Sequence, residues 1–228
     1  IEYRLPNSTS GVYLREEIAR GPARQVSVIG QNNGEDEEEN WLVFQRPVPI
    51  PGNSETVRVE VSFRLEAEDK AAEKSECIVK AKDSSLVVYF PTEKATRFGF
   101  LIQGPYRTTP SRDNIPKDDE WNETLVEETA ELIGDILPDV KDLGLLSVSF
   151  LESLPIRTED FPDDSMFYPI VESVRKTLIE EELLPANDGS FASAGSAVLA
   201  RGADLIKLLS HVQLGQLFQA TAKMKWLT

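Results

Sequence analysis

The chain has 228 residues, a single cysteine and a formal net charge of −15 at pH 7. Its 40% hydrophobic and 28% charged content is typical of a globular protein with a buried core and excludes a disordered chain. The negative charge argues against nucleic acid as the main ligand, although a local basic patch can still bind a small anion. No apolar run approaches the roughly 20 residues of a membrane-spanning helix, and Cys77 cannot close an internal disulfide.

The first residues look like the middle of a strand. Residues 1–4 lack a methionine and lack the basic and then apolar pattern of a signal peptide. We therefore expect a cytoplasmic domain excised from a longer protein. The glycosylation-type triplets at Asn7 and Asn122 are interpreted as chance matches, because no secretory signal accompanies them.

The first hundred residues are predicted to form strands. The clearest is 56–65, where apolar and polar residues alternate, so that one face packs on a core and the other faces water. Weaker strand signals cover 12–18, 24–30, 41–45, 86–90 and 98–103. The run 86–90 is continuously apolar, which predicts a central strand covered on both faces.

Turn-rich or charged stretches separate these strands. Residues 31–40, 47–55 and 91–96 are predicted to be breaks. The acidic run 35–39 is expected to be a solvated loop rather than a metal site, because hard cations need carboxylates in a defined geometry. Residues 66–76 are expected to be an exposed loop or a short helix.

Helical patterns dominate after residue 116. Asp118 or Asp119 can cap a helix that Pro138 is expected to end. A second helix is predicted to begin at Asp164 or Ser165 and to stop before Pro185. Three further segments complete the pattern: 198–209 and 212–223 look like a final helical pair, and the ambiguous stretch 144–154 can contribute a buried strand and a short helix.

Strands followed by helices predict an α+β fold. We expect a mixed β-sheet in the N-terminal half, with helices packed on it and forming the C-terminal half. The two parts are 1–116, which is rich in strands, and 117–228, which is mainly helical. One continuous middle domain with a helical extension is the alternative.

A self-contained active site is not expected. The chain has no P-loop, no dinucleotide-binding glycine pattern and no nucleophile elbow. The lone His211 has no histidine or cysteine near it in sequence, and Cys77 reads as a small buried hydrophobe, so no metal site is predicted. The isolated chain is therefore not expected to be an enzyme.

Residues 104–116, named here the arginine loop, follow the last predicted strand. The loop carries Arg107 and Arg112 together with hydroxyl and amide side chains, and its prolines stiffen it. A fixed arginine can present a planar fork to phosphate. The alternative is an ion pair with Asp113, Asp118 or Asp119, which composition alone favours.

Residues 99–115, followed by Trp121 and Asn122, resemble the segment that follows the ATP-binding domain in large bacterial sacsin-like and HtpG-like proteins of the GHKL type. Residues 41–48 and 213–227 fit the same resemblance. In such chaperones an arginine after a serine reaches the γ-phosphate of ATP. The resemblance places Ser111 and Arg112 at that position. It implies Arg112 as the catalytic contact, with the cofactor-binding support coming from Arg107, Ser111 and Asn114.

The nucleotide pocket of that family is missing from this sequence, because neither its Glu-x-x-x-Asn helix nor its glycine-rich elements occur. ATP and Mg²⁺ are therefore expected to bind through an N-terminal ATPase domain of the same protein. The resemblance implies an accessory middle domain of a chaperone-like ATPase that links ATP turnover to conformational change. Homodimer formation by the full-length protein stays open.

Two alternatives remain at this point. One is a non-catalytic module that binds a partner or client protein, in which the arginine loop is structural. The other is a nuclease-associated or defence ATPase, for which no residue argues directly.

Overall fold

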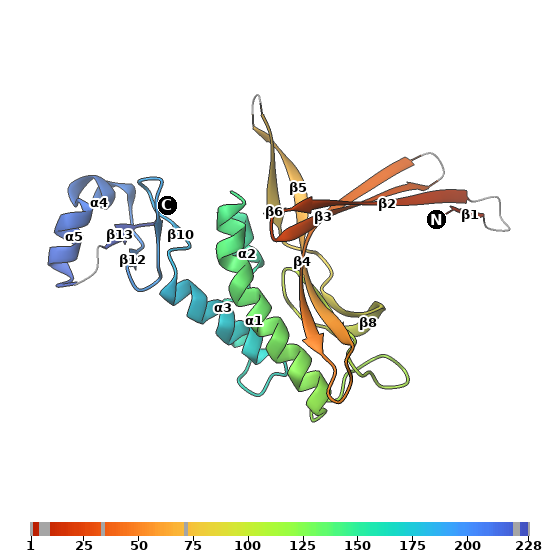
Figure 1. The fold of residues 1–228 in the computed structure, drawn as a ribbon. Coiled ribbons are helices and arrows are strands. Elements are labelled where there is room, and N and C mark those ends of the chain that lie inside the picture. The colour runs from red at the N-terminus through yellow and green to blue at the C-terminus, as the bar shows by residue number, and fades with distance from the viewer. Residues whose placement is uncertain (1, 5–9, 33–34, 71–72, 221–223, 228) are drawn as a thin grey trace.

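The computed structural model describes residues 2–4, 10–32, 35–70, 73–220 and 224–227, and its architecture is α+β (Figure 1). Within these residues a nine-stranded sheet has the order β1-β2-β3-β4-β5-β9-β7-β8, and β6 pairs with β5 beside this path. The strands are β1 (Glu2–Arg4), β2 (Ser10–Arg20), β3 (Ala23–Asn32), β4 (Glu35–Pro49), β5 (Thr56–Lys70), β6 (Glu73–Val79), β7 (Ser85–Val88), β8 (Phe90–Ala95) and β9 (Leu101–Gln103).

The strand β5 holds the sheet together. It runs antiparallel to β4 over residues 56–65, to β9 over residues 60–62 and to β6 over residues 64–70. The pairing of β9 with β7 is parallel, which makes the sheet mixed. Every second residue of β5 from Val59 to Leu65 is buried, so the predicted apolar face is confirmed, but Glu60 of the opposite face is buried as well instead of facing water. The mixed sheet and the α+β class are confirmed as well.

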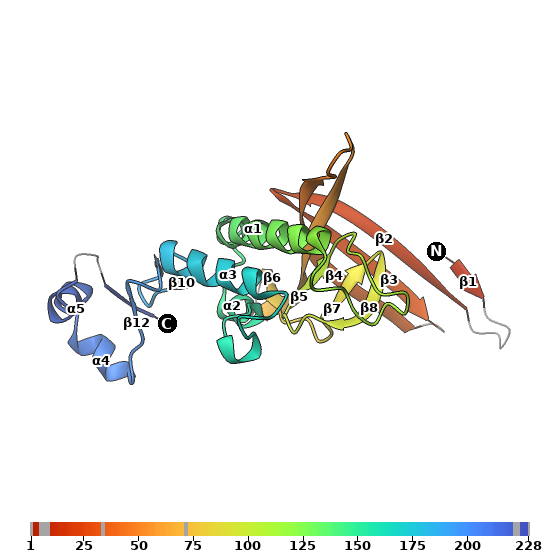
Figure 2. The same cartoon turned by 90° about the horizontal axis from the view of Figure 1, so that it is seen from below.

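Three helices form a layer on one face of the sheet (Figure 2). They are α1 (Glu120–Asp142), α2 (Val148–Ser153) and α3 (Tyr168–Glu180), with a short 3-10 helix, η1 (Thr158–Asp160), before α3. Helix α1 packs on β4 and β5, and α3 packs on α1. One buried apolar cluster runs from the sheet into this layer; Phe63 of β5, for example, lies with its ring centroid 5.4 Å from that of Phe150. Among the described residues, no helix has the length and apolarity to cross a membrane.

Helix α2 rests directly on the backbone of Gly99. The amide of Gly99 donates a hydrogen bond to the carbonyl oxygen of Ser153, 3.0 Å away. A Cβ atom at Gly99 would lie 2.5 Å from that oxygen, so only glycine fits this contact.

The C-terminal residues form a small unit beyond the end of α3, away from the sheet (Figure 1). It contains β10 (Leu184–Pro185), β11 (Phe191–Ala192), β12 (Ala197–Val198), α4 (Ala203–Leu208), α5 (His211–Leu217) and β13 (Lys225–Trp226). Its own apolar cluster is built on Leu214, Met224 and Trp226. The predicted helical pair was therefore too long: α4 and α5 are short, Val198 belongs to a strand, and residues 221–223 lie outside the described residues.

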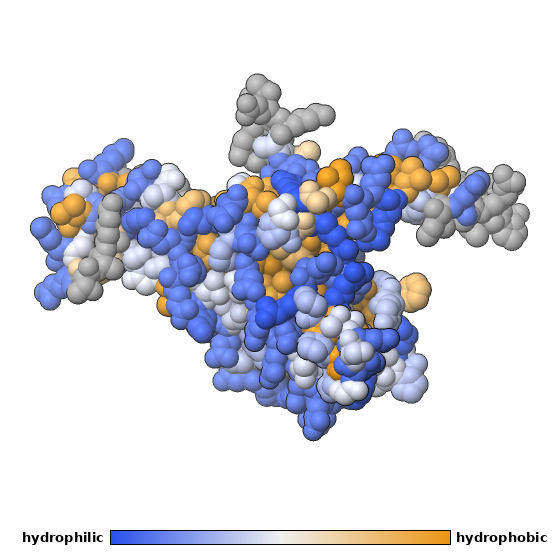
Figure 3. Space-filling view, in the orientation of Figure 1, coloured by the Kyte–Doolittle hydropathy of each residue, from blue (hydrophilic) through white to orange (hydrophobic). Residues whose placement is uncertain are grey.

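Hydrophilic residues cover most of the face drawn in Figure 3, in keeping with the charge of the chain. Hydrophobic residues show where α1 meets the sheet, along the β2–β3 ribbon and on parts of the C-terminal unit. On β2 the exposed apolar side chains include Leu14 and Ile18.

Two charged stretches are strands rather than loops. Residues 35–39 begin β4 and pair with β3, so they are not a loop, although residues 36–39 are exposed as expected. Residues 66–76 belong to the hairpin of β5 and β6, apart from 71–72, which lie outside the described residues. In both cases the backbone ladder to a neighbouring strand fixes a conformation that the side-chain pattern does not reveal.

Other corrections concern apolar and proline residues. The run 86–90 is not a covered central strand, since β7 ends at Val88 and the side chains of Tyr89 and Phe90 are exposed. Residues 91–96 mostly form β8 rather than a break. Pro138 lies inside α1, which continues to Asp142 because the residues around the proline are buried. Residues 144–154 contain the short helix α2, as expected, but no strand.

Candidate functional site

The arginine loop connects β9 to the N-terminus of α1. It starts at Gly104, whose amide donates to the carbonyl oxygen of Val87 at 3.1 Å. Tyr106 then turns inward and is 3% exposed. Its hydroxyl lies 3.3 Å from Oγ1 of Thr129, and the Thr129 hydroxyl donates to the carbonyl oxygen of Leu125. Burial raises the pKa of Tyr106 to about 12, and the hydrogen bond to Thr129 offsets only part of this effect. The beginning of the loop is therefore anchored in the core.

Asn122 ties the two ends of the arginine loop together. This side chain is fully buried in the first turn of α1. Its Oδ1 accepts a hydrogen bond from the amide of Arg107 at 2.8 Å. Its Nδ2 donates to the carbonyl oxygens of Arg107 at 3.0 Å and Pro116 at 3.2 Å. A buried amide that satisfies three backbone groups fixes the shape of the loop, and the sequence analysis did not assign this role to it.

Arg107 forms the ion pair that composition favoured. Its Nη1 lies 3.1 Å from Oδ2 of Asp119, and the arginine side chain is 66% exposed. Partial desolvation acts to raise the pKa of Asp119, but hydrogen bonds from the Asn122 amide and from Arg107 outweigh it and leave that pKa below its ordinary value. Asp119 also caps α1 by accepting from the amide of Asn122, so the predicted cap is confirmed.

Arg112 makes a different set of contacts. It has a left-handed backbone conformation, with φ of 58°. Its Nη2 donates to two carbonyl oxygens of the β7–β8 hairpin, that of Val88 at 2.7 Å and that of Phe90 at 3.2 Å. Its own carbonyl oxygen accepts from the amide of Glu93 at 3.2 Å. Within the described chain no carboxylate forms an ion pair with this guanidinium, so its positive charge is oriented without being neutralised.

The tip of the loop is held by hydroxyl groups. Thr109 donates from Oγ1 to a carboxylate oxygen of Asp113 at 2.5 Å, and Ser111 lies at the limit of hydrogen-bond distance from Thr109. These two hydroxyls hold the pKa of Asp113 below its ordinary value. Asp113 thus accepts its side-chain hydrogen bond from a hydroxyl, whereas Arg112 donates to the β7–β8 hairpin.

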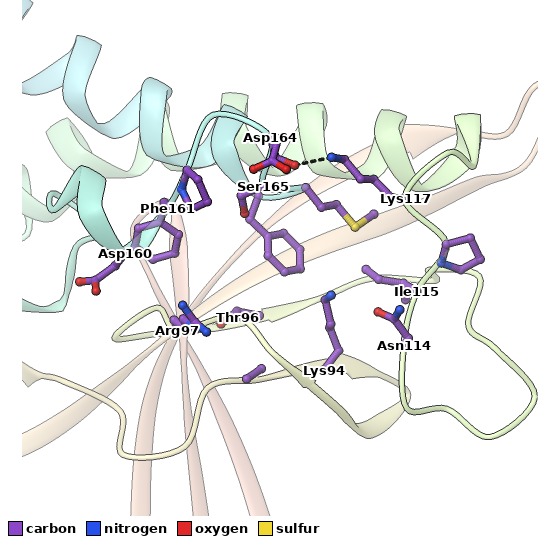
Figure 4. Close-up of a pocket in the computed structure, with 15 residues that line it drawn as sticks. Lys94, Thr96, Arg97, Asn114, Ile115, Lys117, Asp160, Phe161, Asp164 and Ser165 are labelled. Carbon is purple, nitrogen blue, oxygen red and sulfur yellow. Dashed lines mark hydrogen bonds between the residues drawn. The ribbon is translucent and has the colours of Figure 1, made fainter.

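The predicted site residues do not converge on one point. Arg112 faces the hairpin, Arg107 faces Asp119, and the Ser111 side chain is exposed. Asn114 instead lines a cavity with Lys94, Arg97 and Lys117 (Figure 4). Of the four predicted residues, all within the described chain, only Asn114 belongs to that lining.

Sequence reasoning missed the basic side chains of this cavity. Lys94 lies in β8, Arg97 lies two residues after the end of β8, and Lys117 follows the arginine loop. The sequence shows Lys94 and Arg97 close together. It does not show that the fold brings them next to residues 114–117 and 160–167.

The remaining candidate from the sequence, His211, makes contacts that a structural role explains. His211 at the start of α5 contacts the turn between β10 and β11, with Nδ1 3.4 Å from a carboxylate oxygen of Asp188 and Nε2 3.3 Å from the side-chain oxygen of Asn187. Over the residues that the structure describes, no group of three or more His, Cys, Asp or Glu side chains could hold a metal ion.

Comparison with protein-family models, with curated proteins and with solved structures gave no match for this chain.

Proposed function

We propose that this chain is the accessory middle domain of a chaperone-like ATPase of the cytoplasm. In this proposal, a separate N-terminal domain of the same protein holds ATP and Mg²⁺. Arg112 reaches the γ-phosphate when that domain closes on the arginine loop. The observation that carries the proposal is the Arg112 guanidinium, which backbone oxygens orient and which no carboxylate in the described chain neutralises.

The contrast between the two arginines of the loop supports this role for Arg112. Arg107 is neutralised by Asp119, and its charge is therefore of little use to an incoming phosphate. Arg112 uses only Nη2 for the two carbonyl oxygens. Its Nη1 and Nε make no hydrogen bond within the described chain, so one edge of the planar fork remains for a phosphate.

Such an arginine has a defined chemical task. During phosphoryl transfer, negative charge accumulates on the oxygens around the γ-phosphorus, and a fixed guanidinium stabilises it. The clamp formed by Asn122 and the contacts to the β7–β8 hairpin hold the loop before nucleotide arrives. Closure of the ATP domain then needs little further ordering of Arg112, which favours the reaction.

A second candidate function rests on the hairpin itself. Tyr89 and Phe90 at its turn are 78% and 72% exposed, and exposed aromatic side chains are frequent anchors of protein interfaces. In this reading Arg112 only braces the hairpin, and the chain is a non-catalytic module that binds a partner or client protein. The two functions differ in whether loss of Arg112 changes ATP turnover.

The test uses the full-length protein and measures ATP turnover at saturating ATP separately from ATP affinity. Arg112→Ala is expected to lower turnover by about 100-fold or more while ATP affinity changes little, since the effect lies in the transition state. Arg112→Lys keeps a cation but loses the fork, and should recover only part of the turnover. Arg15→Ala, which removes an exposed arginine paired with Glu17, is the matched control.

Unchanged turnover in Arg112→Ala, with the fold intact, would overturn the ATPase proposal. Phe90→Ala distinguishes the partner-binding function from the ATPase function. In the partner-binding module this variant should bind the partner more weakly, and it should leave ATP turnover unchanged.

A further inference from the structure

A cavity of about 530 Å³ lies beside the arginine loop and has no part in the function proposed above. Three segments form it: residues 94–97, residues 114–117 and the stretch 160–167 before α3 (Figure 4). Its volume falls within the range of cavities that hold small molecules. The segments come from distant parts of the sequence, so only the folded chain assembles this space.

Basic side chains gather at this cavity in a chain of strongly negative charge. Lys94, Arg97 and Lys117 line it, against the two carboxylates of Asp160 and Asp164, which leaves one net positive charge in the lining. The side chains of Lys94 and Arg97 form no ion pair and no hydrogen bond with any described residue. In a protein with 39 acidic and 24 basic residues, two unneutralised cations at one cavity favour an anion as the missing partner.

The third cation has a separate task. The amine of Lys117 donates to the carbonyl oxygen of Asp164 and so links the end of the arginine loop to the segment before α3 (Figure 4). This link sets one border of the cavity. Lys94 and Arg97 are therefore the residues free to receive a ligand.

The polar groups around Lys94 suit a phosphate. Asn114 lines the cavity together with Lys94, and its side-chain amide makes no hydrogen bond within the described chain (Figure 4). An ammonium, a guanidinium and an amide together offer ten N–H donors, and the several oxygens of a phosphate can accept many of them. A carboxylate, with two oxygens, would leave more of these donors unused.

The backbone at Arg97 is held in an unfavourable conformation. Its φ is 63°, a region that residues with a Cβ rarely adopt. The neighbouring residues hold this turn in place, since Oγ1 of Thr96 donates to the carbonyl oxygen of Ser84 at 2.6 Å and accepts from the amide of Phe98 at 3.3 Å. Strained backbone of this kind is concentrated at sites that bind ligands.

One wall of the cavity is aromatic. Phe161 and Phe167 line it and are buried, and the ring of Phe161 stacks on Phe98 with centroids 5.3 Å apart. An apolar group of a ligand can contact this wall while its phosphate faces the cations.

We propose that this cavity binds a small phosphate-bearing anion, with Lys94, Arg97 and Asn114 as its direct contacts. The site belongs to this chain alone and needs no ATP-holding domain. The anion-binding proposal can therefore fail while the proposed ATPase function holds, and the reverse is also possible.

Calorimetric titration of the 228-residue chain, in a low-salt buffer without phosphate, tests the proposal. Two probes separate the two sources of the phosphate group: inorganic phosphate and phenyl phosphate. Saturable binding of one anion per chain, weakened by added NaCl, is expected. Tighter binding of phenyl phosphate assigns the site to phosphate esters that use the aromatic wall, and equal binding assigns it to free phosphate.

The variants locate the site. The double variant Lys94→Met with Arg97→Gln should weaken binding at least about tenfold, and Lys207→Met, which removes an exposed lysine of α4, should leave it unchanged. Asn114→Asp, at an exposed position, places a repelling charge at the site and should also weaken binding, so the test does not depend on the double variant folding. Absence of saturable binding, or equal binding by all four proteins, would overturn the proposal.

Discussion

Arg112 reaches across to the β7–β8 hairpin and donates a 2.7 Å hydrogen bond to the carbonyl oxygen of Val88. This contact joins the arginine loop to a hairpin 24 residues earlier in the chain. It explains how a guanidinium can be fixed in direction and remain charged, because a carbonyl oxygen orients the donor without neutralising it.

Loss of the Arg112 side chain should destabilise the fold moderately. Arg112→Ala is expected to lower the free energy of unfolding by about 1–3 kcal/mol, because the partly buried carbonyl oxygen of Val88 and the exposed one of Phe90 lose a charged donor. Arg112→Gly removes the same contacts but relieves the left-handed backbone, so it should be about 1 kcal/mol more stable than Arg112→Ala. Urea denaturation measures both, and equal stability of wild type and Arg112→Ala would contradict the contact.

Removal of the Asn122 clamp should release the arginine loop. Asn122→Ala leaves one amide and two carbonyl groups of the loop without their partner, which is expected to cost about 2–4 kcal/mol of unfolding free energy. Asn122→Asp cannot donate to the carbonyl oxygens and should be comparably harmful. Hydrogen exchange at the amide of Arg107 should accelerate in both variants. The exposed Asn53→Ala serves as the control, and unchanged exchange at Arg107 would contradict the clamp.

Tyr106 should titrate well above the ordinary range of a tyrosine. Its pKa is raised to about 12 in the folded chain from an ordinary value of 10.0, so the fold favours the neutral phenol. The resulting stabilisation, about 3 kcal/mol, is complete below pH 10 and is lost as the pH rises from 10 to 12. Absorbance at 295 nm should show a phenolate that forms only at about pH 12, and this step should be absent in Tyr106→Phe. Titration of all the tyrosines near pH 10 in the folded protein would contradict this burial.

Gly99→Ala should be strongly destabilising. The added methyl group would lie 2.5 Å from the carbonyl oxygen of Ser153, so α2 would have to move off the sheet. We expect a loss of about 2–4 kcal/mol in the free energy of unfolding. Gly202→Ala is the matched control, because nothing lies within 4 Å of a Cβ there. A thermal melt of each variant suffices, and similar melting temperatures would show that the contact with Ser153 can relax.

The sequence allowed the regular parts of the fold to be predicted. The alternation in β5 follows directly from one buried face, and the cap at Asp119 from an acidic side chain before an apolar helical face. The α+β class followed from strands that precede helices. These features depend on side-chain patterns within single segments, and such patterns are visible without the fold.

Other features depend on backbone groups or on distant segments. The acceptors of Arg112 are carbonyl oxygens, which any residue type can supply, so its partner could not be identified from the sequence. The apolar pair Tyr89 and Phe90 suggested burial but lies exposed at a turn. Pro138 suggested a helix end, yet the buried Leu137 and Val140 hold the last turn of α1 in place.

The catalytic role of Arg112 can be measured directly as the turnover number of the full-length protein at saturating ATP. We expect Arg112→Ala to reduce this number by about 100-fold or more, with folding and ATP affinity retained. A turnover number equal to that of the wild type would show that Arg112 only braces the hairpin.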